Sequence, residues 1–366
     1  MRDAYTKHAL KDIRSFCLAP ASLVYYLAVN FRQLAFKAGF CRSARLPVGT
    51  ICVGNVTMGG AGKTPIVIEV VRRLKEKGHE PLVISRGYGR KGSKKTIKLV
   101  ADKHRIHLSF IEAGDEAVLL AENLQGTPII VGSNRFAAGQ YGLRRFASDI
   151  IVLDDGFQHF ALKRDMNLVV FDATVSIVSL RLFPGGTLRE PVSAVRRADA
   201  VILTKANLTN KFGDRVKEIR TIAPGMPVFG ARYDAVGLKR LSEKKEQVEP
   251  EFLRNRKVLC VSAIGNPQAF DVFSEDILGV KRLESLAFRD HHVYTLKDME
   301  DIEKRRRRTG AEWILTTEKD AVKVCILGSD LGRWWSAQIQ ASFFEEDSEE
   351  FDRLLGRLFT NSKVAV

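Results

Sequence analysis

The chain has 366 residues, of which 45% are hydrophobic and 28% charged, a composition typical of globular proteins and unlike that of a disordered chain. Its 58 Lys and Arg against 43 Asp and Glu give a formal net charge of +15, which predicts attraction to an anionic partner: nucleic acid, a nucleotide or an acidic membrane surface. At roughly 100–200 residues per domain, the length predicts two or three domains. The five cysteines are scattered and form no CxxC pair, which disfavours a disulfide framework or a zinc site and favours a reducing cytosol.

An apolar stretch lies near the N-terminus, from residue 16 to residue 40. Within it, Leu23, Leu27, Phe31 and Leu34 share one helical face. Pro20 and several polar residues interrupt the stretch, so a membrane-spanning helix is not predicted. The pattern fits two arrangements equally well: a helix that lies in a membrane interface with cations near anionic head groups, and a terminal helix packed on the protein's own core.

From residue 50 onward, short β-rich runs alternate with helical segments, which predicts βαβ units and a mostly parallel sheet. Strands are predicted at 50–53, 81–85, 128–131, 149–153, 167–171, 200–203, 257–263 and 313–317. Helices are predicted at 64–77, 116–124, from 268 and at 295–308. The polar segment 238–250 is expected to be a linker or an exposed ribbon. The basic run 304–308 is either a nucleic-acid patch or a solvated helix end, and the helix dipole favours the second interpretation.

Residues 50–65 read TICVGNVTMGGAGKTP, a strand followed by a glycine loop and a helix start. In such a loop the backbone N–H groups of Gly59, Gly60, Ala61 and Gly62 would surround the phosphates of a nucleotide. Lys63 would reach the β- and γ-phosphates, and Thr64 would hold Mg²⁺. The strict pattern requires glycine where this chain has Thr57, but the strand–loop–helix context still favours nucleotide binding over a structural turn.

Residues 149–156 read DIIVLDDG, an apolar strand that ends in two acids. A carboxylate at this place in a P-loop protein meets Mg²⁺ at the carboxyl end of the sheet. Asp154 and Asp155 are both candidates for this role. Either residue could instead be an ordinary turn or helix-capping acid.

Several further motifs follow in a fixed order. They are SRGYGR at 85–90, GDEA at 114–117, DDGFQHFALKRD at 154–165, LFPGGTLREP at 182–191, SAIGNPQAF at 262–270, FRDHHVY at 288–294 and TTEKDAVK at 316–323. Together with the glycine loop, this set resembles the tetraacyldisaccharide 4′-kinases of lipid A biosynthesis over nearly the whole chain.

The resemblance implies an α/β protein with a P-loop NTPase-like α/β/α core, a mostly parallel sheet, a smaller C-terminal α/β domain and an N-terminal amphipathic helix. The corresponding ranges are 1–45 for the membrane-associating helix, 46–235 for the core, 236–252 for the linker or β-ribbon and 253–366 for the C-terminal domain. The resemblance also implies transfer of the γ-phosphoryl group of ATP, with Mg²⁺, to the 4′-hydroxyl of a tetraacyldisaccharide 1-phosphate. The expected location is the cytoplasmic face of a bacterial inner membrane, peripherally bound, with neither nucleic acid nor an obligate protein partner.

Carried over by motif, Asp115 and His291 would form the base that takes the hydroxyl proton, since a sugar hydroxyl is a weak nucleophile. Lys63, Arg135 and Arg189 would neutralise phosphate charge. The candidate metal ligands are Thr64, Asp154, Asp155 and Glu116. The candidate contacts to the sugar or its 1-phosphate are Arg86, Tyr88, Gln158 and His159.

Other interpretations of these residues remain open. Asp115 could cap a helix, His292 could take the role given to His291, and Arg189 could belong to a plain ion pair. Lys319 and Asp320 could be structural or line the cleft, and they are left out of the catalytic set. A P-loop ATPase switch is disfavoured because the loop lacks an early second lysine, and no nucleic-acid-binding signature supports a nucleic-acid binder.

Overall fold

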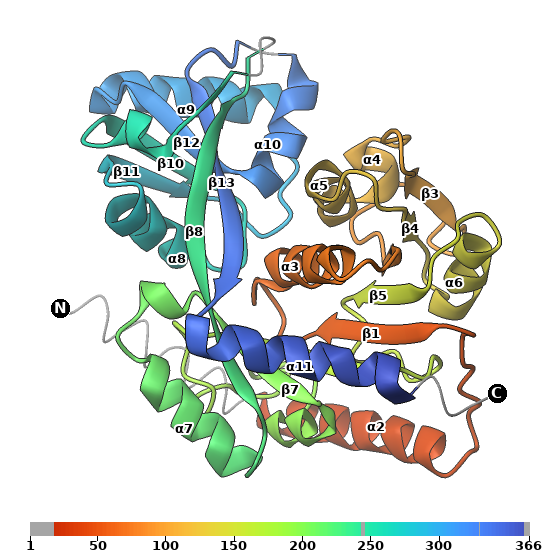
Figure 1. Cartoon of the computed structure of the whole chain (residues 1–366). Helices are drawn as coiled ribbons and strands as arrows, with labels where there is room; N and C mark the ends of the chain where they lie inside the picture. Colours follow the sequence, from red (N-terminus) through yellow and green to blue (C-terminus); the bar gives the residue numbers. More distant parts are fainter. Residues whose placement is uncertain (1–17, 243–245, 329, 362–366) are drawn as a thin grey trace.

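The computed structural model describes residues 18–242, 246–328 and 330–361 (Figure 1). Part of the expected N-terminal segment, residues 1–17, and residues 243–245 of the expected linker lie outside the described residues. Within the described residues, 13 strands join in one sheet whose order is β11-β10-β12-β13-β8-β7-β6-β1-β5-β2-β4-β3, with β9 paired to β8. The predicted fold class, a mostly parallel sheet with helices packed on it, is confirmed.

The first half of the sheet contains β1 to β7 and is parallel except for the edge pair β3 and β4. Its central strands are buried along their whole length, which explains why they appear in the sequence as continuous apolar runs. The strands are β1 (Gly49–Gly54), β2 (Pro81–Ser85), β3 (Lys98–Ala101), β4 (Ile129–Val131), β5 (Ile150–Asp154), β6 (Met166–Asp172) and β7 (Ala200–Thr204).

The second half contains β10 (Lys257–Ser262), β11 (Lys281–Ala287) and β12 (Trp313–Thr317), all parallel. Two long antiparallel strands, β8 (Val228–Arg240) and β13 (Trp334–Phe343), connect it to the first half (Figure 1). Gln338 pairs with Gly237 but Ile339 pairs with Ala235, so Val236 is an extra residue in β8. The polar segment 238–250 contains the end of β8, which pairs with the short β9 (Gln247–Val248) as a ribbon. The ribbon is only partly exposed, since Leu238 and Leu241 are buried.

Ten α-helices and five shorter helical turns are present in the described residues. The α-helices are α2 (Ala19–Lys37), α3 (Lys63–Glu76), α4 (Phe110–Ala113), α5 (Asp115–Asn123), α6 (Arg135–Leu143), α7 (Phe212–Ile222), α8 (Pro267–Val272), α9 (Leu296–Thr309), α10 (Glu318–Val324) and α11 (Glu345–Asn361). The short turns are η1 (Val192–Arg197), η2 (Ala206–Leu208), η3 (Pro250–Leu253), η4 (Phe273–Ile277) and η5 (Cys325–Leu327).

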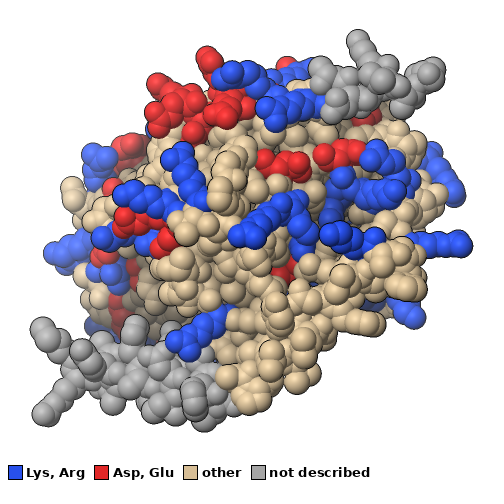
Figure 2. Space-filling model, turned by 90° about the horizontal axis from the view of Figure 1, so that it is seen from below, with Lys and Arg blue, Asp and Glu red and all other residues tan. Residues whose placement is uncertain are grey.

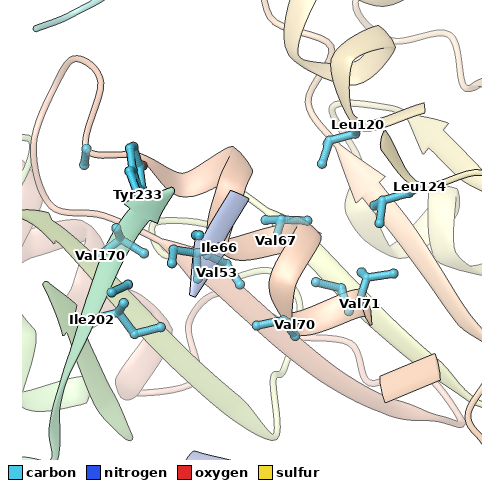
Figure 3. Packing of buried hydrophobic residues seen from close by; sticks show 14 of the residues in the cluster. Val53, Ile66, Val67, Val70, Val71, Leu120, Leu124, Val170, Ile202 and Tyr233 are labelled. Carbon is cyan, nitrogen blue, oxygen red and sulfur yellow. The ribbon is translucent and has the colours of Figure 1, made fainter. Parts of the chain in front are cut away.

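Helix α3 is held at the centre of the first half by its apolar face (Figure 3). Ile66, Val67, Val70 and Val71 are fully buried between the sheet and α5. Each such side chain stabilises the fold by about 1.5–3 kcal/mol relative to its exposed state. The N-terminus of α3, which follows the glycine loop, is thereby fixed over the carboxyl edge of the sheet.

Helix α11 follows β13 and returns to the first half, where its Phe359 stacks on His79, with ring centroids 3.8 Å apart (Figure 1). Its fully buried Phe351 contacts Phe343 and Phe229, with ring centroids 4.2 Å and 5.3 Å apart. Arg73 of α3 donates to Asp352 at 3.0 Å and lies over the ring of Phe343. The last described helix therefore packs on β8 and β13 and contacts the phosphate-loop helix α3.

Helix α2 has no buried residue, and its apolar face is open to solvent, since Leu23, Leu27, Phe31 and Leu34 are 58–75% exposed. Figure 2, which views the underside of the molecule, shows uncharged surface bordered by Lys and Arg side chains. Packing of this face on the protein's own core, one of the two arrangements compatible with the sequence, is therefore not observed. Among the described residues, no helix combines the length and the apolar character needed to cross a bilayer.

The basic run at the end of α9 takes part in ion pairs. Arg306 and Arg307 contact Glu303, and Arg305 and Arg308 contact Glu284. The capping box of Thr295 with Asp298 and the left-handed Gly310 delimit the helix as the sequence predicts. The run fits the solvated-helix interpretation, because the cations neutralise nearby carboxylates and the helix dipole.

We predict that Phe351→Ala lowers the free energy of unfolding by about 3–5 kcal/mol, because it leaves a cavity beside the rings of Phe229 and Phe343. Urea unfolding followed by circular dichroism measures this change. Phe40→Ala, at a phenylalanine that is 88% exposed, serves as the control and should change stability by less than about 0.5 kcal/mol. Equal unfolding midpoints for the two variants would contradict the packing of α11 described above.

Candidate active site

The phosphate loop connects β1 to α3. Its Gly59 and Gly62 have φ angles of 98° and 81°, in the left-handed region that favours glycine. A Cβ atom on Gly62 would come within 2.1 Å of the Tyr233 hydroxyl, so no other residue fits there. Because α3 begins at Lys63, its unpaired N–H groups and its dipole favour an anion at the end of the loop.

Two lysines surround this loop. Lys63 donates to Oδ1 of Asn55 at 3.2 Å and lies 3.4 Å from Asp155. Lys205, which the sequence analysis did not single out, donates to the carbonyl oxygen of Gly60 at 3.3 Å and to Asp172. The loop therefore has positive charge on both sides before any phosphate is bound.

The two acids that follow β5 have opposite environments. Asp154 is buried and accepts a hydrogen bond from the Ser85 hydroxyl at 2.8 Å, while its Oδ1 has no partner among the described residues. Burial, with the negative charges of Glu116 and Asp155, raises the pKa of Asp154 to about 7. At Asp155 burial is outweighed by Lys63 and Arg189, which lower its pKa to about 2.

Asp115 and His291 meet across the two halves of the sheet. Asp115 is the first residue of α5, and His291 lies in the loop after β11 with a left-handed φ of 61°. Nδ1 of His291 is 2.9 Å from Oδ2 of Asp115. A carboxylate only accepts, so Nδ1 carries the proton and the lone pair is on Nε2. Burial would raise the pKa of Asp115, but the hydrogen bond from His291 and the charge of Lys319 keep it below its ordinary value.

Helix α10 of the second half packs beside α5 and contributes Lys319. Its ammonium lies 3.3 Å from Glu116, 3.4 Å from Asp290 and 3.3 Å from Nε2 of His291. Burial would lower the pKa of Lys319, but the carboxylates of Glu116, Asp115 and Asp290 hold it above its ordinary value. Lys319 therefore stays charged at neutral pH.

The second half also reaches the phosphate loop itself. A Cβ atom on Gly265 would lie 2.1 Å from the Gly60 nitrogen, so the two loops are in close contact. Asn266 donates to Asp172 at 2.8 Å and to the Thr174 hydroxyl at 3.1 Å. The SAIGNPQAF motif thus forms one wall of the phosphate site.

All these elements border one cavity of about 750 Å³. Its walls come from α2, the phosphate loop, α5 and the second half. The polar lining residues include Tyr25, Arg32, Lys63, Thr64, Arg86, Tyr88, Glu116, Asp155, Gln158, Arg189, Asp290, His291 and Lys319. A base, a phosphate loop and an acidic strand end therefore face the same space.

Comparison with known proteins agrees with this combination. A family model described as tetraacyldisaccharide-1-P 4′-kinase (LpxK) matches residues 14–359. The chain belongs to this family. It is 38% identical over 311 residues to the tetraacyldisaccharide 4′-kinase of Syntrophus aciditrophicus, covering 83% of this chain and 82% of the relative. The relative from Desulfotalea psychrophila is 36% identical over 353 residues, or 94% and 97% of the two chains.

A solved structure of LpxK from Aquifex aeolicus, described as in complex with ATP, is similar to the whole chain. The TM-score is 0.74 at 30% sequence identity, with 94% of this chain and 99% of that chain covered. The family resemblance stated from sequence motifs is therefore confirmed.

Four residues assigned to the site from motifs of the 4′-kinase family do not line the cavity: Asp115, Arg135, Asp154 and His159. Arg135 is buried and donates to the carbonyl oxygens of Gly132 and Ser133, at 2.7 Å and 3.3 Å. His159 is half-buried, and burial, with the nearby charges of Arg135 and Arg164, lowers its pKa to about 4. Asp154 and Asp115 lie just behind the cavity wall, and the other candidate side chains reach it.

The structure distinguishes several alternatives that the sequence left open. His292 stacks on Phe288 and contacts Asp298, so His291 is the histidine that meets Asp115. Asp115 also accepts the backbone N–H of Glu116, so contact with its own helix start and contact with His291 coexist.

Arg189 donates to both carboxylate oxygens of Asp155, at 3.1 Å and 2.9 Å, and lines the cavity as well. Asp320 is structural, since it accepts the Ala263 N–H and caps α10 with Thr317. Lys319, its neighbour, lines the cavity.

The polar lining residues that the sequence analysis did not assign to the site include Tyr25, Arg32, Lys205 and Asp290. Asp290 lies within the FRDHHVY motif that supplied His291, so the motif contained a signal for it. Tyr25 and Arg32 come from α2, which was considered only for contact with a membrane, through its apolar face and its cations, or with the protein's own core. The Tyr25 hydroxyl donates to the Arg189 carbonyl oxygen at 2.9 Å, which connects α2 to the phosphate site.

We predict that Asp154→Asn stabilises the metal-free protein increasingly as the pH rises. Because the folded pKa of about 7 exceeds the unfolded value near 4, the native state holds this proton more tightly, and stability falls as the pH rises through this range. The stability advantage of the variant should grow by about 2 kcal/mol between pH 5 and pH 8. Urea unfolding in EDTA at both pH values measures it, and a pH-independent difference would refute the prediction.

Proposed function

We propose that the chain transfers the γ-phosphoryl group of ATP to the 4′-hydroxyl of a tetraacyldisaccharide 1-phosphate, a step of lipid A biosynthesis. Membership of the 4′-kinase family supports this activity. The observation that supports the mechanism is the Asp115–His291 contact, which presents Nε2 of His291 to the same cavity as the phosphate loop.

In this proposal the backbone N–H groups of Gly59, Gly60, Ala61 and Gly62 bind the ATP phosphates, because the glycine loop lets the backbone approach closely. Lys63 is fixed by Asn55 and Asp155 at the entrance to α3, where its charge faces the β- and γ-phosphates. Arg189 supplies a second cation on the same side. Arg135, which is buried behind Asp154, would act on the phosphates only through the charge it places there.

The environment of Asp154 fits a magnesium ion, although the described part of the chain contains no preassembled group of three His, Cys, Asp or Glu ligands. Oδ1 of Asp154 is buried without a partner in the described structure, and repulsion from Glu116 and Asp155 contributes to its raised pKa, a cost that a cation would remove. We propose that Thr64, Asp154, Asp155 and Glu116 hold Mg²⁺, directly or through water. Bound Mg²⁺ supplies positive charge that stabilises the phosphates during transfer.

His291 acts as the general base in this mechanism. Its Nε2 accepts the proton of the 4′-hydroxyl as that oxygen bonds to the γ-phosphorus, and the bond to the β–γ bridging oxygen breaks to release ADP. Asp115 holds the ring in the required tautomer and stabilises the imidazolium that forms. Because the two residues come from different halves, the base exists only when both halves are in contact.

The cavity extends from the phosphate loop toward α2, and we propose that the glycolipid head group occupies this end. Arg86, Tyr88 and Gln158 line it and would contact the sugar or its 1-phosphate, with Arg32 of α2 beside them. His159, which the cavity does not reach, would act through Gln158 and the neighbouring loop. The division into a core, a ribbon and a smaller C-terminal α/β domain remains part of the proposal, with α11 placed against the core.

The acyl chains require an apolar environment, and the exposed face of α2 offers one. We propose that this face lies in the cytoplasmic leaflet of the inner membrane, with the neighbouring cations at the head groups. The protein would then be peripheral, and its substrate would reach the cavity from the membrane side.

We predict that Asp115→Ala and His291→Ala each lower kcat by about 10²–10⁴-fold while changing the KM for ATP less than threefold, because both act on proton removal in the transition state. The assay measures transfer of label from γ-labelled ATP to the disaccharide lipid in the presence of Mg²⁺. His292→Ala, at the neighbouring histidine that faces Asp298, is the matched control and should retain near-normal turnover. Lys63→Ala should abolish transfer; normal turnover in both dyad variants would refute the base assignment.

A second prediction concerns the membrane. Replacing Leu23, Leu27 and Phe31 with serine should weaken binding to anionic phospholipid vesicles by more than about tenfold, because three apolar side chains leave the interface. Flotation with vesicles measures the bound fraction. Serine at Val178, Leu296 and Ile326, three exposed apolar residues outside α2, is the control and should leave binding intact. Equal losses in both variants would show that α2 has no special role.

A further inference from the structure

The ammonium group of Lys319 lies among three polar side chains at the cavity, those of Glu116, Asp290 and His291. Nζ lies 3.3 Å from Glu116 of the first half and 3.4 Å from Asp290 of the second half. It also lies 3.3 Å from Nε2 of His291, the nitrogen that faces away from Asp115. The proposed mechanism assigns no role to this lysine.

The direction of these hydrogen bonds is determined by the groups themselves. An ammonium only donates, and Nε2 of the neutral imidazole only accepts when Nδ1 carries the proton. Lys319 therefore donates to the same lone pair that takes the hydroxyl proton in the proposed mechanism. His291 is thus held from two sides, by Asp115 at Nδ1 and by Lys319 at Nε2.

A purely structural role would be to hold α5 against α10, but other contacts already do so. Asn123 of α5 lies 3.4 Å from Glu318 of α10. Lys323, one turn after Lys319, is buried, pairs with Asp320 at 2.8 Å and lies 4.0 Å from Asp115. Removal of Lys319 therefore leaves the interface with several of its contacts, and a variant at this position should fold.

We propose that Lys319 is a positioning residue for phosphoryl transfer: it orients the neutral His291 ring and joins it to Glu116 and Asp290 until the acceptor hydroxyl takes its place at Nε2. This inference rests on the proposed function. After displacement, Lys319 keeps its ion pairs with Glu116 of α5 and with Asp290, the residue before His291, so the two segments that carry the dyad stay joined across the two halves. Lys319 itself neither gains nor loses a proton in the step.

The test is the kinetics of Lys319→Met and Lys319→Arg in the full chain, with labelled ATP, Mg²⁺ and the disaccharide lipid. Loss of orientation at the base should lower kcat of Lys319→Met by about 10²-fold, with the KM for ATP changed less than threefold. Lys319→Arg keeps a cationic donor and should recover turnover to within about tenfold of the wild type. Lys297→Met removes an exposed lysine of α9 and should leave turnover unchanged.

A spectroscopic measurement separates positioning from a structural role. In protein labelled with ¹⁵N-histidine, Nε2 of His291 should show the shift of a hydrogen-bonded, unprotonated nitrogen, assigned by its loss in His291→Gln. In Lys319→Met this resonance should move toward the value of a free nitrogen. An unchanged resonance, together with unchanged thermal unfolding, would overturn the inference.

The two hypotheses fail in different ways. If the wild-type chain transfers no label to the glycolipid, the proposed function fails and the inference fails with it. If the wild type transfers label and Lys319→Met turns over within threefold of it, the inference alone is overturned. A loss in Lys319→Met with recovery in Lys319→Arg and an altered His291 resonance supports both.

Discussion

The hydrogen bond between Asp115 and His291 is the constraint on which the site depends. Each residue needs the other as a hydrogen-bond partner. Asp115 is buried, and His291 lies on a loop with a left-handed backbone conformation. The carboxylate needs a donor to remain charged in a buried position, and the imidazole needs an acceptor to fix its tautomer. One contact between the two halves satisfies both needs and leaves Nε2 facing the phosphate loop.

Near this contact, the carboxyl groups of Asp154 and Asp155 lie in different environments, which shift their pKa values in opposite directions. Asp155 is paired with Lys63 and Arg189 and remains ionised, whereas the buried Asp154, one residue earlier, retains its proton until near neutral pH. Adjacent residues of the same type thus differ in charge because one has cationic neighbours and the other has a serine hydroxyl and anionic neighbours. The sequence DD alone contains no sign of this difference.

Much of the sheet could be predicted from sequence because its signals are local. Buried parallel strands such as β2 and β12 have the same bounds as the apolar runs in the sequence. The glycine loop likewise indicates where α3 begins. Elements defined by distant partners were missed, among them β13, which forms only against β8 and β12. Helix α11 has a helical repeat of apolar residues, including Phe351 and Leu355, that could have been found.

Prediction of the site residues from sequence has the same limit: signals that are local can be found, and those that depend on distant contacts cannot. Motifs brought Asp115 and His291 together correctly, because the family resemblance links segments that are 176 residues apart. Motifs could not indicate that Arg135 is turned toward backbone carbonyls, or that Lys319 rather than Asp320 reaches the cavity, because both facts depend on side-chain direction. The role of α2 in the cavity wall was missed for a similar reason: its amphipathic pattern drew attention to the outer face, while Tyr25 and Arg32 are on the inner one.

The extra residue in β8 has a mechanical consequence. The two halves share β8 and β13, and a bulge bends its strand and increases the local twist. The extra residue Val236 therefore contributes to the angle at which the second half meets the first, and so to the approach of His291 to Asp115.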